Sequence, residues 1–409
     1  MRRDPLRVLF AVQGEGRGHL TQALAVAAML RRRGHQVVGA VAGTSRWGDV
    51  PDFFREGLAA RVETVESPGF VSGADGRIRP VATFAANVAR MRRFAPSLDR
   101  ITTVLDRLEP DVVVNFYEGL MGLHGLLRVS DVPVVAVGHQ FFSGHPGYPL
   151  LPGQPLQRVA MEAYTSLVGV GAETRLALSF YDAPDRPGVR VVPPLLRSQL
   201  FDLGDAPGDG SILVYLMEPA MAPALAAWSD RNPGVRIHTF AAVEPHDHSP
   251  SLTFHGLSGT EFLKRMAAAR GVVCTAGFET VSEAMWLGTP ALLVPTPGHY
   301  EQRCNAVDAV AAGAGVHAET LDLDPLLDYL DHHAEAAQAE TTSRFRRWIA
   351  RAEGRAVGAI EEAAGLAPLG GDGAGDGLAD EVEVREARYL PPTSSVDGRG
   401  PSENASTWE

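Results

Sequence analysis

Residues 274–305, CTAGFETVSEAMWLGTPALLVPTPGHYEQRCN, are the stretch that decides the fold of this chain. A short apolar run at 271–274 leads into a Thr-Ala-Gly turn, and the spacing of apolar residues predicts a helix that begins near Thr280. Gly288 and Pro290 end that helix, and residues 291–294 form the next buried strand. The order strand, glycine turn, helix, strand predicts a βαβ unit of a parallel sheet.

The turn at Gly277 predicts an anion site. A glycine turn aimed into a helix start leaves backbone N–H groups free at the positive end of the helix dipole, which suits phosphate. Glu283 follows one turn into the helix, where a carboxylate can accept hydrogen bonds from vicinal ribose hydroxyls. Gln302 and Asn305 lie on the predicted next loop and helix start, where their amides can bind sugar hydroxyls.

This block resembles the donor-binding motif of nucleotide-sugar glycosyltransferases of the GT-B fold. That group includes the N-acetylglucosaminyltransferase that makes lipid II and the plant and bacterial UDP-sugar transferases. The motif comprises Gly277, the run 279–284 (ETVSEA), Gly288-Thr289-Pro290, Pro295 and the run 301–306 (EQRCNA). The resemblance implies an α/β fold of two Rossmann-like domains facing across a cleft. It adds Glu301 to the donor-binding residues.

The phosphate part of the motif departs from many members of the group. They begin it with a histidine that contacts phosphate, whereas this chain has Thr275 and Ala276 in that neighbourhood. The resemblance therefore implies that phosphate is bound by backbone amides, together with the hydroxyls of Thr275 and Thr280. Packing alone also produces strand, glycine and helix units, but it does not require Glu283, Gln302 or Asn305.

Length, charge and composition limit the possible domain organisation, partners and location of the protein. A chain of 409 residues with 45% hydrophobic residues predicts two globular domains, which we place at 1–200 and 201–365 with a disordered acidic tail at 366–409. The net charge of −12 argues against nucleic acid as a partner. The two cysteines have no metal-ligand spacing, and no signal peptide or run of about 20 apolar residues is seen. We expect a cytoplasmic protein, with any membrane contact peripheral, at the inner face.

A second glycine-rich turn follows the first predicted strand, residues 6–12. Its sequence, QGEGRGH at 13–19, lacks the G-x-G-x-x-G spacing of dinucleotide-binding proteins, and no acidic residue ends the second strand. The turn resembles the first loop of the GT-B transferases, in which a histidine acts as general base or lines the acceptor pocket. That match implies His19 as the base and Gly18 as an acceptor-site residue, since imidazole titrates near neutral pH. The alternative for His19 is a residue near a helix N-cap that is bonded to backbone.

The remaining candidates follow buried strands of the first predicted domain. Relatives often have an aspartate after the strand at 111–114 that orients the histidine, but this chain has Asn115, so Glu118 is the nearest substitute. The strand at 132–137 ends in a His-Gln element whose residues we assign to the acceptor site: His139, Gln140 and Phe141. His139 is also a second candidate base.

These residues predict an inverting glycosyltransferase that moves a sugar from a UDP- or dTDP-linked donor to an acceptor hydroxyl without a metal or other cofactor. The acceptor class stays open between a lipid, a glycan and a small molecule. Two alternatives remain at this point: a nucleotide-sugar epimerase and a non-catalytic nucleotide-sugar-binding protein. Helices are further expected at 84–108, interrupted by Pro96, and at 306–312 and 342–364.

Overall fold

The computed structural model describes residues 5–14, 16–44, 50–69, 71, 73, 79–128, 130–203, 207–216, 219–333 and 335–367. These residues belong to one compact unit. The predicted tail lies outside the described residues from 368 onward.

The first half of the chain forms a seven-stranded parallel sheet in the order β3-β2-β1-β4-β5-β6-β7. Its strands are β1 (Arg7–Val12), β2 (Gln36–Thr44), β3 (Val62–Glu66), β4 (Val112–Phe116), β5 (Val134–Gly138), β6 (Ala172–Leu178) and β7 (Val189–Val192). The helices between them are α1 (Gly18–Arg32), α2 (Asp52–Leu58), α3 (Pro80–Leu108), α4 (Gly119–Leu127) and α5 (Pro155–Val168), with short 3-10 turns η1 (His139–Gly144) and η2 (Ser198–Leu200).

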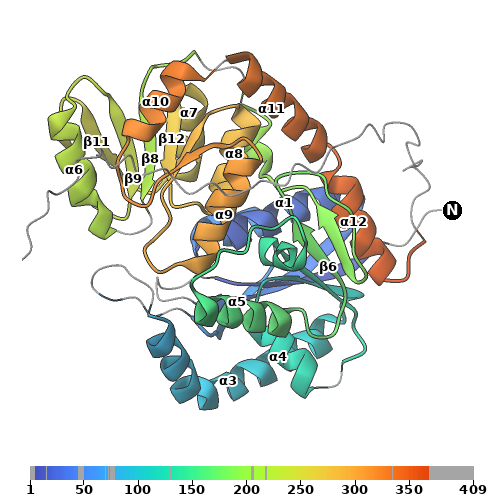
Figure 1. The fold of residues 1–409 in the computed structure, drawn as a ribbon. Coiled ribbons are helices and arrows are strands. Elements are labelled where there is room, and N and C mark those ends of the chain that lie inside the picture. Colours follow the sequence, from blue (N-terminus) through green and yellow to red (C-terminus); the bar gives the residue numbers. More distant parts are fainter. Residues whose placement is uncertain are drawn as a thin grey trace, which may run out of the picture. The chain divides into compact units, whose positions relative to one another are not determined.

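Apolar side chains on both sides of β1 explain why helices cover both faces of this sheet. Val8, Phe10 and Val12 belong to a buried cluster that includes α1 and α12 (Ala352–Ala363). Leu9 and Ala11 point to the opposite face and pack with residues of α3 and α4. Successive side chains of a strand face opposite ways, so a run that is apolar throughout must be covered on both sides. In Figure 1, α3 and α4 lie below the sheet, with α1 and α12 on its other side.

The second half forms another seven-stranded sheet, in the order β10-β11-β9-β8-β12-β13-β14, parallel except for the β10–β11 pair. Its strands are β8 (Ile212–Leu216), β9 (Ile237–Ala241), β10 (His246–Ser249), β11 (Leu252–His255), β12 (Gly271–Cys274), β13 (Ala291–Leu293) and β14 (Gly315–His317). The other elements are η3 (Pro219–Met221), α6 (Ala222–Arg231), α7 (Gly259–Ala268), α8 (Phe278–Leu287), α9 (Tyr300–Ala311), α10 (Asp324–His332) and α11 (Glu335–Ile349). The predicted α/β class with two Rossmann-like domains is confirmed. The boundaries at 200 and 365 stay a prediction.

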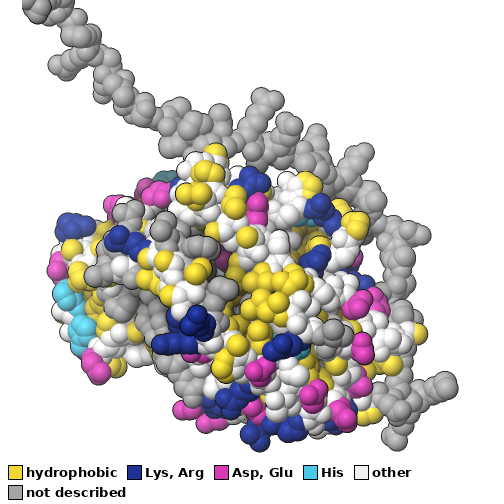
Figure 2. All heavy atoms as spheres, turned by 90° about the horizontal axis from the view of Figure 1, so that it is seen from below, with side chains coloured by type: hydrophobic (Ala, Val, Ile, Leu, Met, Phe, Trp, Pro, Cys, Tyr) yellow, Lys and Arg dark blue, Asp and Glu magenta, His cyan; other side chains and the backbone are white. Residues whose placement is uncertain are grey.

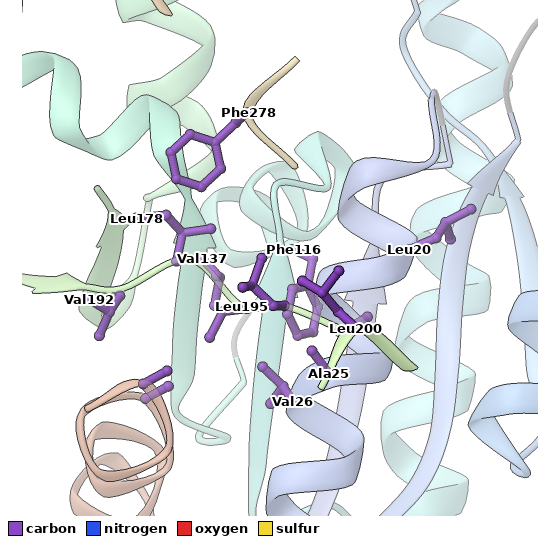
Figure 3. Packing of buried hydrophobic residues seen from close by; sticks show 14 of the residues in the cluster. Leu20, Ala25, Val26, Phe116, Val137, Leu178, Val192, Leu195, Leu200 and Phe278 are labelled. Atoms are coloured by element: carbon purple, nitrogen blue, oxygen red, sulfur yellow. The ribbon is translucent and has the colours of Figure 1, made fainter. Parts of the chain in front are cut away.

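The last described helix returns to the first sheet. α12 contacts α1 and the strands β4 to β7. Arg355 of α12 donates a hydrogen bond from Nε to the backbone carbonyl of Val191, at 2.7 Å. The segment after β7 is also buried here, because Leu195 and Leu200 belong to the same cluster as Val26 of α1 (Figure 3). The first sheet therefore depends on residues from the far end of the described chain.

Three predicted helices differ from the structure. α3 continues through Pro96, which, like Arg92 one turn earlier, is exposed, so water can bond the carbonyl that proline leaves without a helical partner. The helix expected at 306–312 begins six residues earlier, as α9, so Gln302 lies in its first turn rather than on a loop. The helix expected at 342–364 is divided into α11 and α12. The strands β6, β10 and β14 were not predicted.

One surface carries exposed apolar side chains. Figure 2, which views the side formed by α3, α4 and α5, shows hydrophobic side chains gathered among basic and acidic ones. Leu126 and Leu127 of α4 and Leu156 and Val159 of α5 are each more than half exposed. In the part of the chain that the structure describes, no helix is long and apolar enough to cross a bilayer.

Two glycines of α4 offer a matched test of how α4 packs on α5. A Cβ at buried Gly122 would overlap the carbonyl oxygen of Leu167, whereas a Cβ at exposed Gly125 would lie at ordinary contact distance, 3.5 Å, from the carbonyl oxygen of Val170. We expect Gly122→Ala to lower the free energy of unfolding by about 1–3 kcal/mol through overpacking. Gly125→Ala should raise it by up to about 1 kcal/mol through helix propensity. Urea unfolding measures both, and equal effects would contradict the close helix contact.

Candidate active site

The glycine-rich turn after β1 brings the start of α1 to the carboxyl edge of the first sheet. Gly14 lies so close to β2 that a Cβ there would overlap the carbonyl oxygen of Gly43. Gly16 has φ of +82°, a left-handed conformation that favours glycine. These two constraints explain Gly14 and Gly16 of the turn, which ends at Gly18 and His19, the first residues of α1.

The turn after β12 brings the start of α8 to the carboxyl edge of the second sheet. Gly277 is the N-cap of α8, and the first backbone hydrogen bond of the helix runs from the N–H of Val281 to the carbonyl of Gly277, at 3.3 Å. The N–H groups of residues 278–280 consequently have no carbonyl within the helix to bond. Thr275, just before the turn, is buried. This end of α8 is where the sequence predicts an anion site.

Both helix starts line one cavity of about 490 Å³. Its lining includes most of the predicted residues: Gly18, His19, His139, Gln140, Thr275, Gly277, Thr280, Glu283, Glu301 and Gln302. Glu118, Phe141 and Asn305 are not among the lining residues. The fold thus brings residues that are more than 250 positions apart in the sequence to a single site.

His19 is held by ring stacking and by one side-chain contact. Its imidazole stacks on the ring of Tyr117, with centroids 5.6 Å apart. Its Nδ1 lies 3.3 Å from Oε1 of Gln22. Burial lowers the pKa of His19 to about 4, against a smaller opposing effect of the Gln22 contact, so the imidazole is neutral at pH 7 and can accept a proton.

Gln22 links His19 to the other half of the site. Its Nε2 donates a hydrogen bond to Oε2 of Glu279, at 3.2 Å. Burial and the neighbouring Glu283 raise the pKa of Glu279 to about 8, and its Oε1 has no hydrogen-bond partner among the described residues. Sequence reasoning did not single out either residue. The place of Glu279 within the motif run 279–284 was the signal that could have found it.

Glu283, the predicted ribose ligand, is already paired. Its Oε1 accepts a hydrogen bond from Nε of Arg197 at 2.6 Å, and the Glu283 side chain is 1% exposed. Arg197 comes from the segment after β7 and also lines the cavity. Sequence reasoning missed Arg197, because nothing in the linker indicates that it crosses to α8. The guanidinium of Arg197 places a positive charge in the cavity, which suits an anionic ligand.

The assignment of Glu118 as the partner of His19 is corrected by the structure. Glu118 is the N-cap of α4: its Oε1 accepts hydrogen bonds from the N–H of Leu120, at 3.0 Å, and from the hydroxyl of Ser67. The side chain is fully buried, which raises its pKa to about 7, and it does not line the cavity. The strand end after β4 is covered by α4, so Glu118 satisfies that helix start instead of reaching His19.

The remaining predicted residues form a polar layer beside the cavity. Gln140 donates from Nε2 to Oε1 of Glu301 at 2.9 Å, and burial raises the pKa of Glu301 to about 7. Oε1 of Gln302 accepts from the N–H of Thr296 at 2.8 Å, which leaves the NH₂ of Gln302 free to donate. These three side chains all line the cavity, and two of them come from the first turn of α9.

Three candidates lie deeper than predicted. His139 uses Nδ1 to donate to the carbonyl of Leu178, at 2.6 Å, and its ring stacks on Phe278 with centroids 4.2 Å apart. Burial lowers its pKa to about 4. Asn305 accepts a hydrogen bond from the hydroxyl of Tyr148 at 3.0 Å, and Phe141 is buried in an aromatic cluster. This geometry favours a packing role for Asn305 and Phe141 over direct contact with a ligand.

A sequence profile described as glycosyl transferase family 1 matches residues 6–333. The chain belongs to this family. As a glycosyltransferase it catalyses transfer, which separates it from the epimerase and the non-catalytic binder considered above. In the part of the chain that is described, no group of three or more His, Cys, Asp or Glu side chains is arranged to hold a metal ion.

The chain is also similar to curated relatives in sequence and to solved structures in fold. The UDP-N-acetylglucosamine--N-acetylmuramyl-(pentapeptide) pyrophosphoryl-undecaprenol N-acetylglucosamine transferase of Methylobacterium nodulans is 29% identical over 341 residues, which is 78% of this chain and 85% of the relative. The enzyme of the same name from Streptomyces avermitilis is 28% identical over 333 residues, or 75% and 84%. The glycotransferase of kitacinnamycin has a similar fold, with a TM-score of 0.59 at 17% identity over 89% of this chain and 99% of that one. Acinetobacter baumannii MurG has a TM-score of 0.53 at 18% identity over 88% and 100%.

The raised pKa of Glu279 predicts a pH dependence of stability. Between the ordinary pKa of 4.5 and the folded pKa of about 8, the folded state holds a proton that the unfolded state has released. The stabilisation is therefore complete below pH 4.5 and is lost as the pH rises through about 8. Glu279→Gln removes this dependence, so the variant should gain stability over wild type between about pH 5 and pH 8.5 by more than about 1.4 kcal/mol, the equivalent of one pKa unit.

Urea unfolding at the two pH values measures the difference. The control is Glu56→Gln, which changes an exposed glutamate of α2 and should leave the pH dependence as in wild type. A Glu279→Gln variant that differs from wild type by the same amount at both pH values would show that Glu279 is ionised in the folded protein.

Proposed function

We propose that this glycosyltransferase transfers a sugar from a UDP-linked donor, with UDP-N-acetylglucosamine as the preferred donor, to an acceptor hydroxyl with inversion and without a metal. The observation that carries the proposal is the single cavity on which the starts of α1 and α8 both open. It brings a neutral imidazole and an anion site together. The donor follows from the names of the relatives described above, which are UDP-N-acetylglucosamine transferases.

The donor diphosphate would bind at the start of α8. The free N–H groups of residues 278–280 and the dipole of the helix favour negative charge there, and the Thr275 and Thr280 side chains line the same wall. Glu279, with its pKa raised to about 8, is neutral at pH 7 and does not repel the diphosphate. Tyr215, Phe240 and Leu257 provide an apolar wall for the nucleobase.

The ribose and the sugar would occupy neighbouring parts of the cavity. Glu283 remains the proposed ribose ligand, now as a carboxylate that Arg197 neutralises. Glu301 and the free NH₂ of Gln302 are the proposed ligands of the sugar hydroxyls, with Gln140 holding Glu301 in place.

The chemical step would begin at His19. Its Nε2 accepts the proton of the acceptor hydroxyl as the acceptor oxygen attacks the anomeric carbon, on the face opposite the diphosphate. The bond between the anomeric carbon and the diphosphate oxygen breaks, and UDP leaves with the electron pair. Amides at the start of α8 stabilise the charge that develops on the leaving group. Displacement from the opposite face inverts the anomeric centre.

The acceptor is the less defined partner. The relatives' names describe a lipid-linked acceptor, and the exposed apolar side chains of α4 and α5 are compatible with a peripheral contact to a membrane face. The fold is equally that of a glycotransferase of kitacinnamycin. A lipid acceptor is therefore our first choice, and glycans and small molecules remain open. The cytoplasmic location also stays a prediction.

Gly277 provides a test of the donor site that spares the fold. An added Cβ at Gly277 meets no atom within 4 Å, the φ of −68° suits any residue, and Gly277 lines the cavity. We expect Gly277→Val to weaken UDP binding at least tenfold, because it blocks the approach of phosphate to the amides. A thermal-shift titration with UDP measures it.

The matched control is Gly234→Val, in the turn before β9. Gly234 also has no atom within 4 Å of an added Cβ and does not line the cavity. UDP should shift the melting temperature of this control as it does that of wild type. If UDP, dTDP, GDP and ADP all leave the folded wild-type protein unshifted, the proposed donor site is wrong.

His19 provides the test of the chemical step. We expect His19→Ala to lower kcat about 10²–10⁴-fold, the usual contribution of a positioned general base. The thermal shift with UDP should be retained, because the hydrogen bonds that join His19 to α8 among the described residues run through Gln22. Transfer assayed with UDP-N-acetylglucosamine and a lipid acceptor measures kcat. An unchanged rate with intact donor binding would assign the base elsewhere, with His139 the next candidate.

A further inference from the structure

Gln22 lies between His19 and Glu279. Its side-chain oxygen lies 3.3 Å from Nδ1 of His19, and its side-chain nitrogen lies 3.2 Å from the carboxyl of Glu279. Gln22 is 3% exposed and Glu279 is 8% exposed, so water competes little for these contacts. The three residues form a row of hydrogen-bonded side chains from α1 to the first turn of α8.

The donors and acceptors of these three side chains determine which atom donates in each contact. The NH₂ of Gln22 donates to Oε2 of Glu279, which places the proton of the neutral Glu279 carboxyl on its unpaired Oε1, and the amide oxygen of Gln22 faces His19. That oxygen can only accept, which requires a proton on Nδ1 of His19. A neutral imidazole with a proton on Nδ1 has its lone pair on Nε2.

We propose that Gln22, oriented by Glu279, is a positioning residue that holds His19 as the Nδ1–H tautomer, with Nε2 free to take the acceptor's proton. The inference rests on the proposed function, because it assigns a role to His19 as base. It also explains why Glu118 is not needed to orient His19, since that carboxylate caps α4 and the partner of His19 comes from its own helix. A neutral amide takes the place that a carboxylate would otherwise have.

Glu279 gives this arrangement a second property. It lies in the first turn of α8, next to the amides proposed to bind the diphosphate. The group that orients Gln22 is therefore part of the donor wall, so the tautomer of the base is fixed by contacts from both halves of the chain. The unpaired Oε1 of Glu279 remains available to a ligand in the cavity.

The test compares three variants of the full chain. Gln22→Leu removes the acceptor at similar size, Gln22→Glu keeps an acceptor, and Gln36→Leu makes the same change at an exposed residue of β2. ¹⁵N NMR of histidine-labelled protein reports the tautomer directly, with the His19 signals assigned by their loss in His19→Ala. We expect Nδ1–H in wild type, Gln22→Glu and Gln36→Leu, and a shift toward Nε2–H in Gln22→Leu.

Kinetics provides the second readout. We expect kcat to fall at least about tenfold in Gln22→Leu, with KM for the donor unchanged, and to recover in Gln22→Glu. A Gln22→Leu protein that keeps Nδ1–H and wild-type kcat would overturn the proposal and make Gln22 a packing residue. If Gln22→Leu does not fold, Gln22→Met carries the same comparison.

The NMR and kinetic measurements distinguish a failure of this inference from a failure of the proposed function. The NMR measurement needs no substrate, so it tests the positioning even if no acceptor is turned over. A tautomer that changes in Gln22→Leu supports the inference, whereas an inactive wild type with normal UDP binding counts against the acceptor assignment alone. An unchanged tautomer in an active enzyme overturns the inference and leaves the proposed function standing.

Discussion

The free N–H groups at the start of a helix are the constraint on which this site depends. In a parallel sheet each helix begins where a strand ends, so all helix starts gather at one edge of the sheet. In both sheets the strand order reverses beside a central strand, β1 in the first and β8 in the second. The helices α1 and α8 begin at these reversals and open on one cavity. The proposed catalytic arrangement follows from this shared edge geometry more than from any single side chain.

The two halves of the site are joined by polar contacts. Gln22 with Glu279, Arg197 with Glu283, and Gln140 with Glu301 each link a residue of the first half to one of the second. Buried polar groups stabilise little in net terms, but each becomes costly when its partner is removed. These contacts therefore favour one relative placement of the residues around the cavity. Specificity of arrangement, rather than large stabilisation, is their main contribution.

Sequence reasoning predicted the fold well where local patterns are strong. The apolar runs and glycine turns located the strands beside both helix starts, and the fold class and enzyme class are confirmed. The misses have physical causes. β6 was missed because its first residues, such as Glu173 and Arg175, are polar at the half-buried end of the strand. Pro96 predicts an interruption, but α3 continues through it, because water can bond the carbonyl of Arg92 that has no N–H partner at Pro96.

Side-chain pairing was less predictable, because it depends on packing between distant segments. Nothing local indicates that Arg197 reaches Glu283, or that Glu118 is used as a helix cap. The roles proposed for the cavity residues stay predictions.

The return of α12 to the first sheet has a consequence for how the chain is made. A ribosome releases residues at about 5–20 per second, and domains usually fold in the order of synthesis. Here the part of the first sheet's face that α12 covers, over β4 to β7, stays open to water until residues 352–363 have emerged. The second sheet, which is contiguous from β8 to β14, can complete its strands before the first sheet is covered. The half that is synthesised first is thus the half that matures last, and a nascent chain must keep that apolar face from aggregating meanwhile.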